Sequence, residues 1–91
     1  MQKNLDLYHA LIGQTARGKL LAHFLEHPER SWFIAQAAQA AGVDPASAQR
    51  QLRQLEAFGL LESSSKGYGK FYRLRENGAV DLLQKLYSLS Q

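Results

Sequence analysis

The chain has 91 residues, a size typical of one small domain, and we expect a single domain spanning residues 1–91. Its composition is 45% hydrophobic and 21% charged with a net charge of +3, which excludes wholesale disorder. The absence of cysteine excludes a disulfide framework and any thiolate metal site. Neither a signal peptide nor an apolar run long enough to cross a membrane is present, so we expect a cytoplasmic protein.

The first third of the chain shows two helical patterns. Apolar residues at helical spacing over residues 4–12 predict a short helix that stops at Gly13. Thr15 is a suitable N-cap for a second helix, which Pro28 ends because proline disfavours helical geometry in the residue before it. The second helix has a broad apolar face, formed by Ala16, Leu20, Leu21, Phe24 and Leu25.

Residues 34–61 form a pattern of two helices joined by a tight turn. The short aromatic segment before them, residues 31–33, is compatible with a small strand. Gly42 permits the positive φ with which a helix commonly ends. Asp44 is a good N-cap for the following helix, and Pro45 suits its first position, where a missing N–H costs nothing.

The helix after this turn has two contrasting faces and ends at Gly59. Its apolar stripe is formed at helical spacing by Ala48, Leu52 and Leu55, with Phe58 close to it. The opposite face carries short or hydrogen-bonding side chains without bulk: Ala46, Ser47, Gln49, Arg50, Arg53 and Gln54. A helix that presents serine, glutamine and arginine outward after a tight turn is suited to lie in a groove.

Two strands joined by a glycine-containing turn follow over residues 60–75, and they predict a β-hairpin. Alternation along the second strand places Tyr72 and Leu74 on the face toward the helices. The same alternation places Arg73 and Arg75 on the exposed side.

A last helix is predicted from Ala79 to about Leu89. Apolar residues cover more than one stripe of this helix, which is typical of a helix that packs against two surfaces. One surface is its own domain, and we expect the other to be a second copy of the chain. The alternative is a helix that belongs wholly to the core.

The basic residues are concentrated in the second half of the chain. Residues 1–45 hold four bases and four acids and are neutral, whereas residues 46–75 hold six bases and two acids and carry a charge of +4. Concentrated positive charge is typical of a protein that binds a polyanion.

The order of these elements resembles a winged helix-turn-helix domain, most strongly over residues 31–75. The pattern Ala-x-x-Ala-Gly-Val-Asp-Pro-x-Ser-x-x-Arg-x-Leu-x-x-Leu-Glu-x-x-Gly-Leu-Leu, with the junction LEAFGLLE, is similar to that of ArsR-type and related prokaryotic transcriptional regulators. The opening LIGQTARGKLLAHFLEHPERSW also resembles the start of such domains, including relatives associated with minimal nucleotidyltransferases. The resemblance implies a mostly α fold with a small β-hairpin wing: a helix-turn-helix over about 34–58, the wing over about 60–75 and a dimerisation helix over about 79–89.

The resemblance further implies a transcriptional regulator, a repressor in the simplest case, that binds an inverted repeat of double-stranded DNA as a homodimer. The implied groove-facing positions of the second helix are Ala46, Ser47, Gln49, Arg50 and Arg53. The implied wing positions are Lys66, Tyr68, Lys70 and Arg73. Metal-sensing members of the family use cysteine-containing sites, so this chain departs from that branch, and we expect neither a metal nor a cofactor.

Other interpretations of these residues stay open. The main alternative is a winged-helix module that binds a protein partner, such as a nucleotidyltransferase; RNA or single-strand binding is a third, and the exposed cations are also compatible with plain solubility. His23, Glu26 and His27 spell the H-x-x-E-H pattern of a zinc peptidase family, with both histidines on one helix face. Pro28 follows at once and no third ligand is identifiable, which favours histidines that merely suit a helix C-terminus. We therefore do not expect an enzyme.

Overall fold

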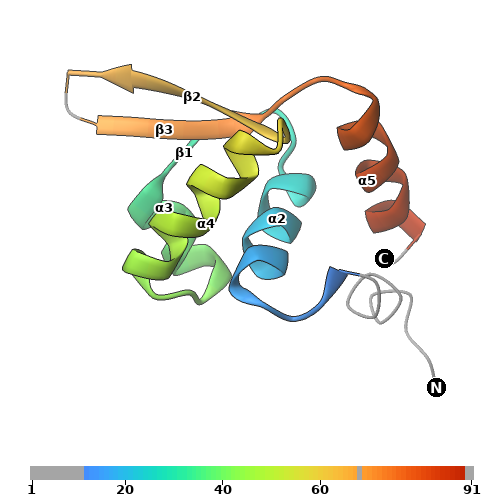
Figure 1. Ribbon diagram of the computed structural model, residues 1–91, viewed down its shortest axis with the longest axis horizontal. Helices are drawn as coiled ribbons and strands as arrows, with labels where there is room; N and C mark the ends of the chain where they lie inside the picture. Colours follow the sequence, from blue (N-terminus) through green and yellow to red (C-terminus); the bar gives the residue numbers. More distant parts are fainter. Residues whose placement is uncertain (1–11, 68, 90–91) are drawn as a thin grey trace.

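The computed structural model describes residues 12–67 and 69–89, and its elements follow the predicted order (Figure 1). The elements are α2 (Ala16–Glu26), β1 (Trp32–Phe33), α3 (Ile34–Ala41), α4 (Pro45–Ala57), β2 (Leu61–Lys66), β3 (Gly69–Leu74) and α5 (Gly78–Leu89). The helix predicted over residues 4–12 lies outside the described residues apart from Ile12. This architecture confirms the predicted fold, a winged helix-turn-helix that is mostly α with a β-hairpin wing.

Helix α2 begins where Thr15 predicts that it should. Thr15 Oγ1 accepts a hydrogen bond from the backbone N–H of Gly18 at 3.1 Å, which satisfies one of the otherwise free N–H groups of the first turn. Glycine is required at position 18 because a Cβ there would overlap the carbonyl oxygen of Gly13. The buried side chains of α2 are Leu20, Leu21, Phe24 and Leu25.

The turn between α3 and α4 has the predicted chemistry. Gly42 follows α3 in the left-handed conformation, with φ +69°, and the backbone N–H of Val43 donates to the carbonyl of Ala38 at 2.9 Å. Asp44 then caps α4, because its Oδ2 accepts from the backbone N–H groups of Ala46 and Ser47 at 3.1 and 3.2 Å. These caps set the direction in which α4 leaves the turn.

The apolar stripe of α4 packs against α2 and α3, and Ala48, Leu52 and Leu55 are each at most 1% exposed. Phe58 does not join this stripe and is 64% exposed, which corrects the expectation that it lies close to the apolar face. At about 100° per residue Phe58 falls roughly a quarter of a turn from the centre of the stripe. The helix also ends at Ala57, and Gly59 turns the chain away with φ +82°.

The strands form one antiparallel sheet in the order β1-β3-β2, so β3 is the central strand. Leu61 pairs with Leu74 in the β2–β3 hairpin, and Trp32 pairs with Tyr72 between β1 and β3. Tyr72 and Leu74 are buried beneath the sheet, as the alternation predicts. The hairpin extends well past β1 and over the end of the molecule that holds α3 and α4 (Figure 1).

Helix α5 lies against α2 at the opposite end of the molecule from the hairpin tip (Figure 1). Val80 and Tyr87 are buried, and Gln84 Nε2 donates to the carbonyl of Leu25 at 3.1 Å. Leu82 and Leu89, in contrast, are 69% and 66% exposed. Within residues 12–67 and 69–89, no helix has the length and apolar character that crossing a membrane requires.

Replacing Gly18 with alanine is expected to destabilise the protein by about 1–3 kcal/mol. The added methyl group would overlap the Gly13 carbonyl, and this cost outweighs the roughly 1 kcal/mol that alanine gains in helix propensity. Urea unfolding followed by circular dichroism measures the difference. Lys19→Ala, at the exposed next position, is the matched control and should change stability by less than about 0.5 kcal/mol. Equal or higher stability of Gly18→Ala would show that the chain around Gly13 yields to the methyl group.

Candidate nucleic-acid interface

The outward face of α4 carries the predicted groove-facing side chains. Ala46, Gln49, Arg50 and Arg53 are exposed, and Ser47 is half-buried. Arg50 Nη2 lies 3.4 Å from Ser47 Oγ, one turn earlier on the same face. In the part of the chain that the structure describes, neither Arg50 nor Arg53 forms an ion pair. Both guanidinium groups therefore keep their full charge and most of their donors for a partner.

One flank of α4 is held by Arg17 of α2. Arg17 Nε donates to Gln51 Oε1 at 2.9 Å, and Arg17 Nη2 donates to Gln54 Oε1. The same guanidinium lies over the ring of Phe58, with its central carbon 5.4 Å from the ring centroid. Arg17 thus joins two successive turns of α4 and stabilises the orientation of its outward face. The sequence carries no signal for this contact, because its partners lie more than thirty residues away.

The other flank of α4 is joined to the hairpin. Ser63 Oγ of β2 donates to Glu56 Oε2 at 2.6 Å, a short, charge-assisted hydrogen bond. This contact was not predicted from the sequence either. Together with Arg17 it leaves α4 little freedom to roll about its own axis.

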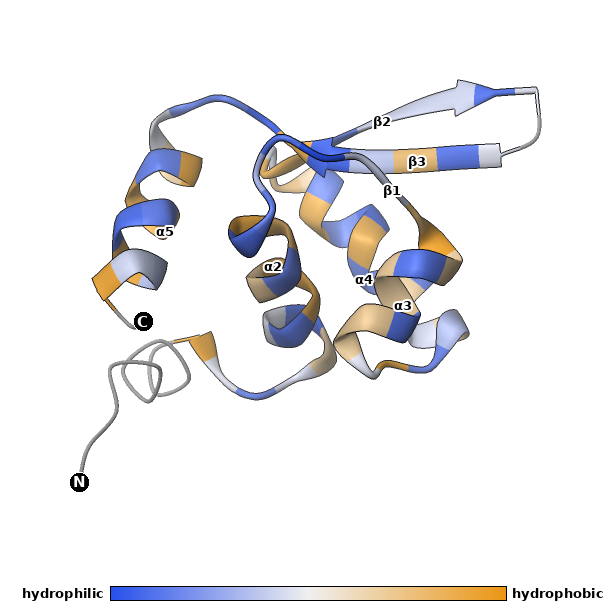
Figure 2. Cartoon of the chain, turned by 180° about the vertical axis from the view of Figure 1, so that it is seen from behind, coloured by the Kyte–Doolittle hydropathy of each residue, from blue (hydrophilic) through white to orange (hydrophobic). Residues whose placement is uncertain are grey.

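Of the predicted wing residues, Lys66 and Lys70 lie at the outer end of the hairpin, whereas Arg73 lies near its base, opposite Glu62. Lys66 and Lys70 are exposed near its turn, and Tyr68 lies outside the described residues. Arg73 Nε lies 3.7 Å from Glu62 Oε2 of the paired strand, so its charge is partly offset. Strand β2 is hydrophilic over most of its length, as expected for a hairpin that extends into solvent (Figure 2).

The two histidines of the H-x-x-E-H pattern pack around an aromatic ring. The His23 ring lies edge-on to Trp32 with 4.3 Å between centroids, and the His27 ring lies 5.1 Å from that of His23. The central guanidinium carbon of Arg30 lies 4.5 Å from the centroid of the Trp32 ring. Burial lowers the pKa of His23 below its ordinary value, and the neighbouring His27 lowers it further. Within residues 12–67 and 69–89, no three or more metal-ligating side chains gather into a metal site.

The arrangement of the elements defines the class of fold, a winged helix-turn-helix with a basic outward helix. The sequence matches no described protein family, and no curated protein matches it. Several solved structures resemble it. For the three described below, the two percentages that follow the identity are the share of this chain and the share of the other chain that the alignment covers. The repressor BigR from Xylella fastidiosa has a TM-score of 0.66 at 23% identity, over 94% and 82%. Sso10a-2, a DNA-binding protein from Sulfolobus solfataricus, has 0.63 at 23% identity, over 81% and 75%.

The third is Bordetella bronchiseptica BpsR, a protein whose DNA binding is regulated by 6-hydroxynicotinic acid. Its TM-score is 0.63 at 16% identity, over 90% of this chain. The chain spans 61% of the length of BpsR. At these identities the likeness shows that the chain shares the winged helix-turn-helix fold of these regulators.

Stability is expected to fall as the pH is lowered from about 7.5 to 5.5, with His23 as a contributor. Because burial lowers the folded-state pKa of His23, the unfolded chain takes up a proton first, near its ordinary pKa of about 6.5. The stabilisation that neutral His23 provides is therefore present above that pH and is lost below it. Glu26 acts in the opposite direction and Arg30 in the same direction as the burial.

Urea unfolding at a series of pH values measures this dependence. His23→Gln should flatten the profile, whereas His27→Gln is the matched control and should keep most of it. A His23→Gln profile that parallels the unsubstituted protein would show that other groups cause the dependence.

Proposed function

We propose that this protein is an ArsR-like transcriptional regulator that binds double-stranded DNA. The observation that carries the proposal is the outward face of α4, where Arg50 and Arg53 are exposed and form no ion pair with any described residue. Hydrogen bonds on both flanks restrict rotation of the helix, so its arginines keep a fixed orientation. A fold shared with several DNA-binding regulators supports the same proposal.

In the proposed mechanism α4 enters the major groove. Arg50 and Arg53 suit guanine O6 and N7, and Gln49 suits adenine, each such pair discriminating by about 1–3 kcal/mol. Ser47 adds a short hydrogen-bonding group, and Ala46 permits a close approach of the helix to the groove. Base contacts of this kind supply specificity and little of the non-specific affinity.

The wing supplies phosphate contacts in this mechanism. Lys66 and Lys70 flank the turn of the hairpin and are exposed residues. Tyr68 and Arg73 complete the proposed wing set, with Arg73 shared between Glu62 and the backbone of DNA. Such contacts fix the register of the protein on the duplex and make its affinity depend on salt.

We propose that the active form is a homodimer joined through α5. Leu82 and Leu89 lie seven residues apart on one stripe of the helix, and both are largely exposed. A second copy would bury this stripe and give the complex two-fold symmetry. The two α4 helices would then sit about one turn of DNA apart, roughly 34 Å, on an inverted repeat. A repressor follows where that repeat overlaps a promoter.

DNA binding is tested by fluorescence anisotropy with random duplex DNA at several salt concentrations. The logarithm of affinity should fall linearly with that of salt, by about 0.9 for each phosphate neutralised. Lys66→Ala and Lys70→Ala should each reduce that slope by about one phosphate. No binding at low salt would reject the proposal and favour a module that binds a protein partner.

Specific contacts are tested on fragments selected from the source genome. Arg50→Ala and Arg53→Ala should each weaken the selected site by about 1–3 kcal/mol and weaken random DNA less. Arg30→Ala is the matched control, because it removes an exposed arginine that lies outside α4 and the wing. Equal losses on both kinds of DNA would make these arginines phosphate contacts.

The dimer is tested by light scattering at micromolar concentration. Leu82→Asp should convert the dimer to a monomer, since a carboxylate would be buried in an apolar interface. Ser88→Asp adds the same charge to an exposed position of α5 away from the stripe, and it should leave the dimer intact. An unsubstituted chain that is itself monomeric would remove the inverted-repeat prediction and leave DNA binding to be judged separately.

A further inference from the structure

The end of α4 and the start of α5 meet at one side chain, that of Asn77. Asn77 Nδ2 donates to the carbonyl oxygen of Gly59 at 2.8 Å, and Asn77 Oδ1 accepts from the backbone N–H of Val80 at 2.9 Å. The Gly59 carbonyl oxygen needs a donor and the Val80 N–H needs an acceptor, so only one orientation of the Asn77 amide satisfies both. The side chain therefore links the two helices in a defined way.

Each side of this link is firmly tied to its own helix. Gly59 follows Phe58, the C-cap of α4, and the backbone N–H groups of Gly59 and Leu60 bond back to the carbonyls of Glu56 and Leu55. On the other side, the carbonyl of Asn77 accepts from the backbone N–H of Asp81 at 3.0 Å and so opens α5. A shift of either helix is thus transmitted to the Asn77 amide.

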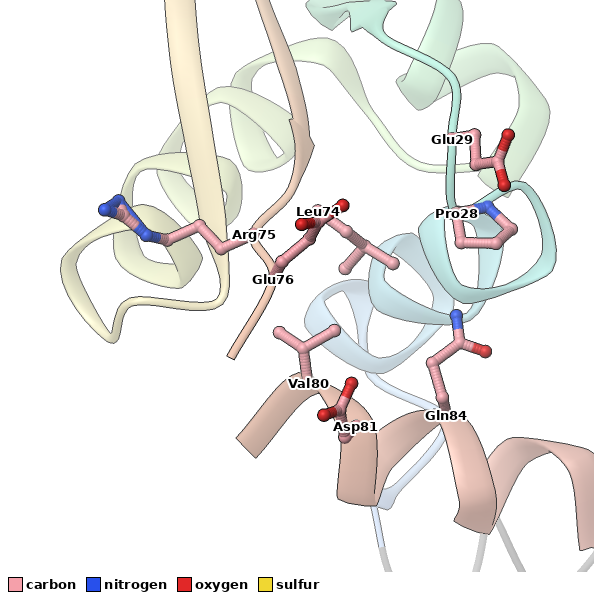
Figure 3. Close-up of a pocket in the computed structure, with 8 residues that line it drawn as sticks. All are labelled: Pro28, Glu29, Leu74, Arg75, Glu76, Val80, Asp81 and Gln84. Carbon is pink, nitrogen blue, oxygen red and sulfur yellow. The ribbon is translucent and has the colours of Figure 1, made fainter. Parts of the chain in front are cut away.

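Besides the Asn77 link, the first turn of α5 is held by the buried side chain of Val80, but its packing toward the loop after α2 is incomplete. A pocket of about 210 Å³ lies here, lined by Val80, Asp81 and Gln84 of α5 and by Pro28 and Glu29 of the loop after α2 (Figure 3). Side-chain packing here is incomplete, so it restrains the tilt of α5 less than a filled interface would. Farther along, Gln84 attaches α5 to α2 and Tyr87 is buried, which holds the helix near the domain. The exit of α4 is joined to the chain before α5 by the backbone hydrogen bond from Arg75 N–H to the Leu60 carbonyl at 3.0 Å, and the Asn77 link extends this connection into the first turn of α5.

We propose that Asn77 is a positioning residue that fixes the angle between α5 and the outward helix α4. This inference rests on the proposed function: if α5 joins two copies and α4 enters DNA, the Asn77 link sets the separation and tilt of the two α4 helices. Asn77 would then govern which spacing of half-sites the dimer accepts, without touching DNA. An asparagine that only capped α5 would have no such effect.

Asn77→Asp separates linking from capping. Aspartate is nearly isosteric, keeps the acceptor for the Val80 N–H and suits the positive end of a helix dipole, so α5 stays capped. It loses the donor to Gly59 and places a carboxylate against that carbonyl oxygen. Asn77→Ser is the second variant, because serine caps well but is too short to reach Gly59.

The angle is measured directly by pulsed electron resonance between two spin labels. The chain has no cysteine, so Ala57→Cys and Lys85→Cys, both at exposed positions, place unique labels on α4 and α5. Dilution with unlabelled chain isolates the distance within one protomer. The protein with Asn77 intact should give a narrow distribution of distances between the labels. Asn77→Asp and Asn77→Ser should broaden or displace that distribution at unchanged helix content. A distribution identical in all three proteins would overturn the proposal.

The DNA consequence is measured on selected sites whose half-site spacing is lengthened or shortened by one or two base pairs. The unsubstituted protein should prefer one spacing by about tenfold or more, and Asn77→Asp should lose most of that preference while binding random duplex equally well. A preference that survives in Asn77→Asp would overturn the proposal. If neither protein binds any DNA, the proposed function fails by itself, and the spin-label distances still decide whether Asn77 fixes the helix angle.

Discussion

The burial of one stripe of α4 is the constraint on which the rest of the structure depends. Ala48, Leu52 and Leu55 are buried against α2 and α3, and their burial decides which side of α4 faces solvent. The set of side chains that α4 exposes to solvent follows from this rotation. The arginines at positions 50 and 53 face outward because the leucines between and beside them face inward.

Apolar packing alone sets the rotation of a helix only loosely, and two polar contacts refine it. Arg17 hydrogen-bonds to the side of α4 that faces α2. On the side that faces the sheet, Ser63 hydrogen-bonds to Glu56. Each of these bonds is individually modest, on the order of 1 kcal/mol. Acting on opposite flanks, they oppose rotation in both directions, which is what a surface that matches a rigid partner requires.

Most of the local structure could be predicted from the sequence, because its causes are local. The caps at Thr15 and Asp44 and the turn at Gly42 act within a few residues, and each was found where it was expected. What sequence reasoning missed depends on residues far apart in the chain: the Arg17 contacts, the Glu56–Ser63 bond and the pairing of β1 with β3. A two-residue strand has no periodicity from which to infer a partner. Phe58 was misplaced because it lies about a quarter of a turn from the centre of the stripe and just past the end of the helix.

The pairing of β1 with β3 has a consequence for how the protein folds. Phe33 and Phe71 lie opposite each other, with ring centroids 5.2 Å apart, and the whole of α3, α4 and β2 lies between them in the sequence. Pairing β1 with β3 requires this long loop to close, so the second neighbour of the central strand is held by contacts of high sequence separation, which are typical of slower folding. If β1 were released from β3, the chain would loosen at both ends of the helix-turn-helix. Partial unfolding that spares α4 while releasing the sheet is therefore disfavoured, and the molecule should open cooperatively.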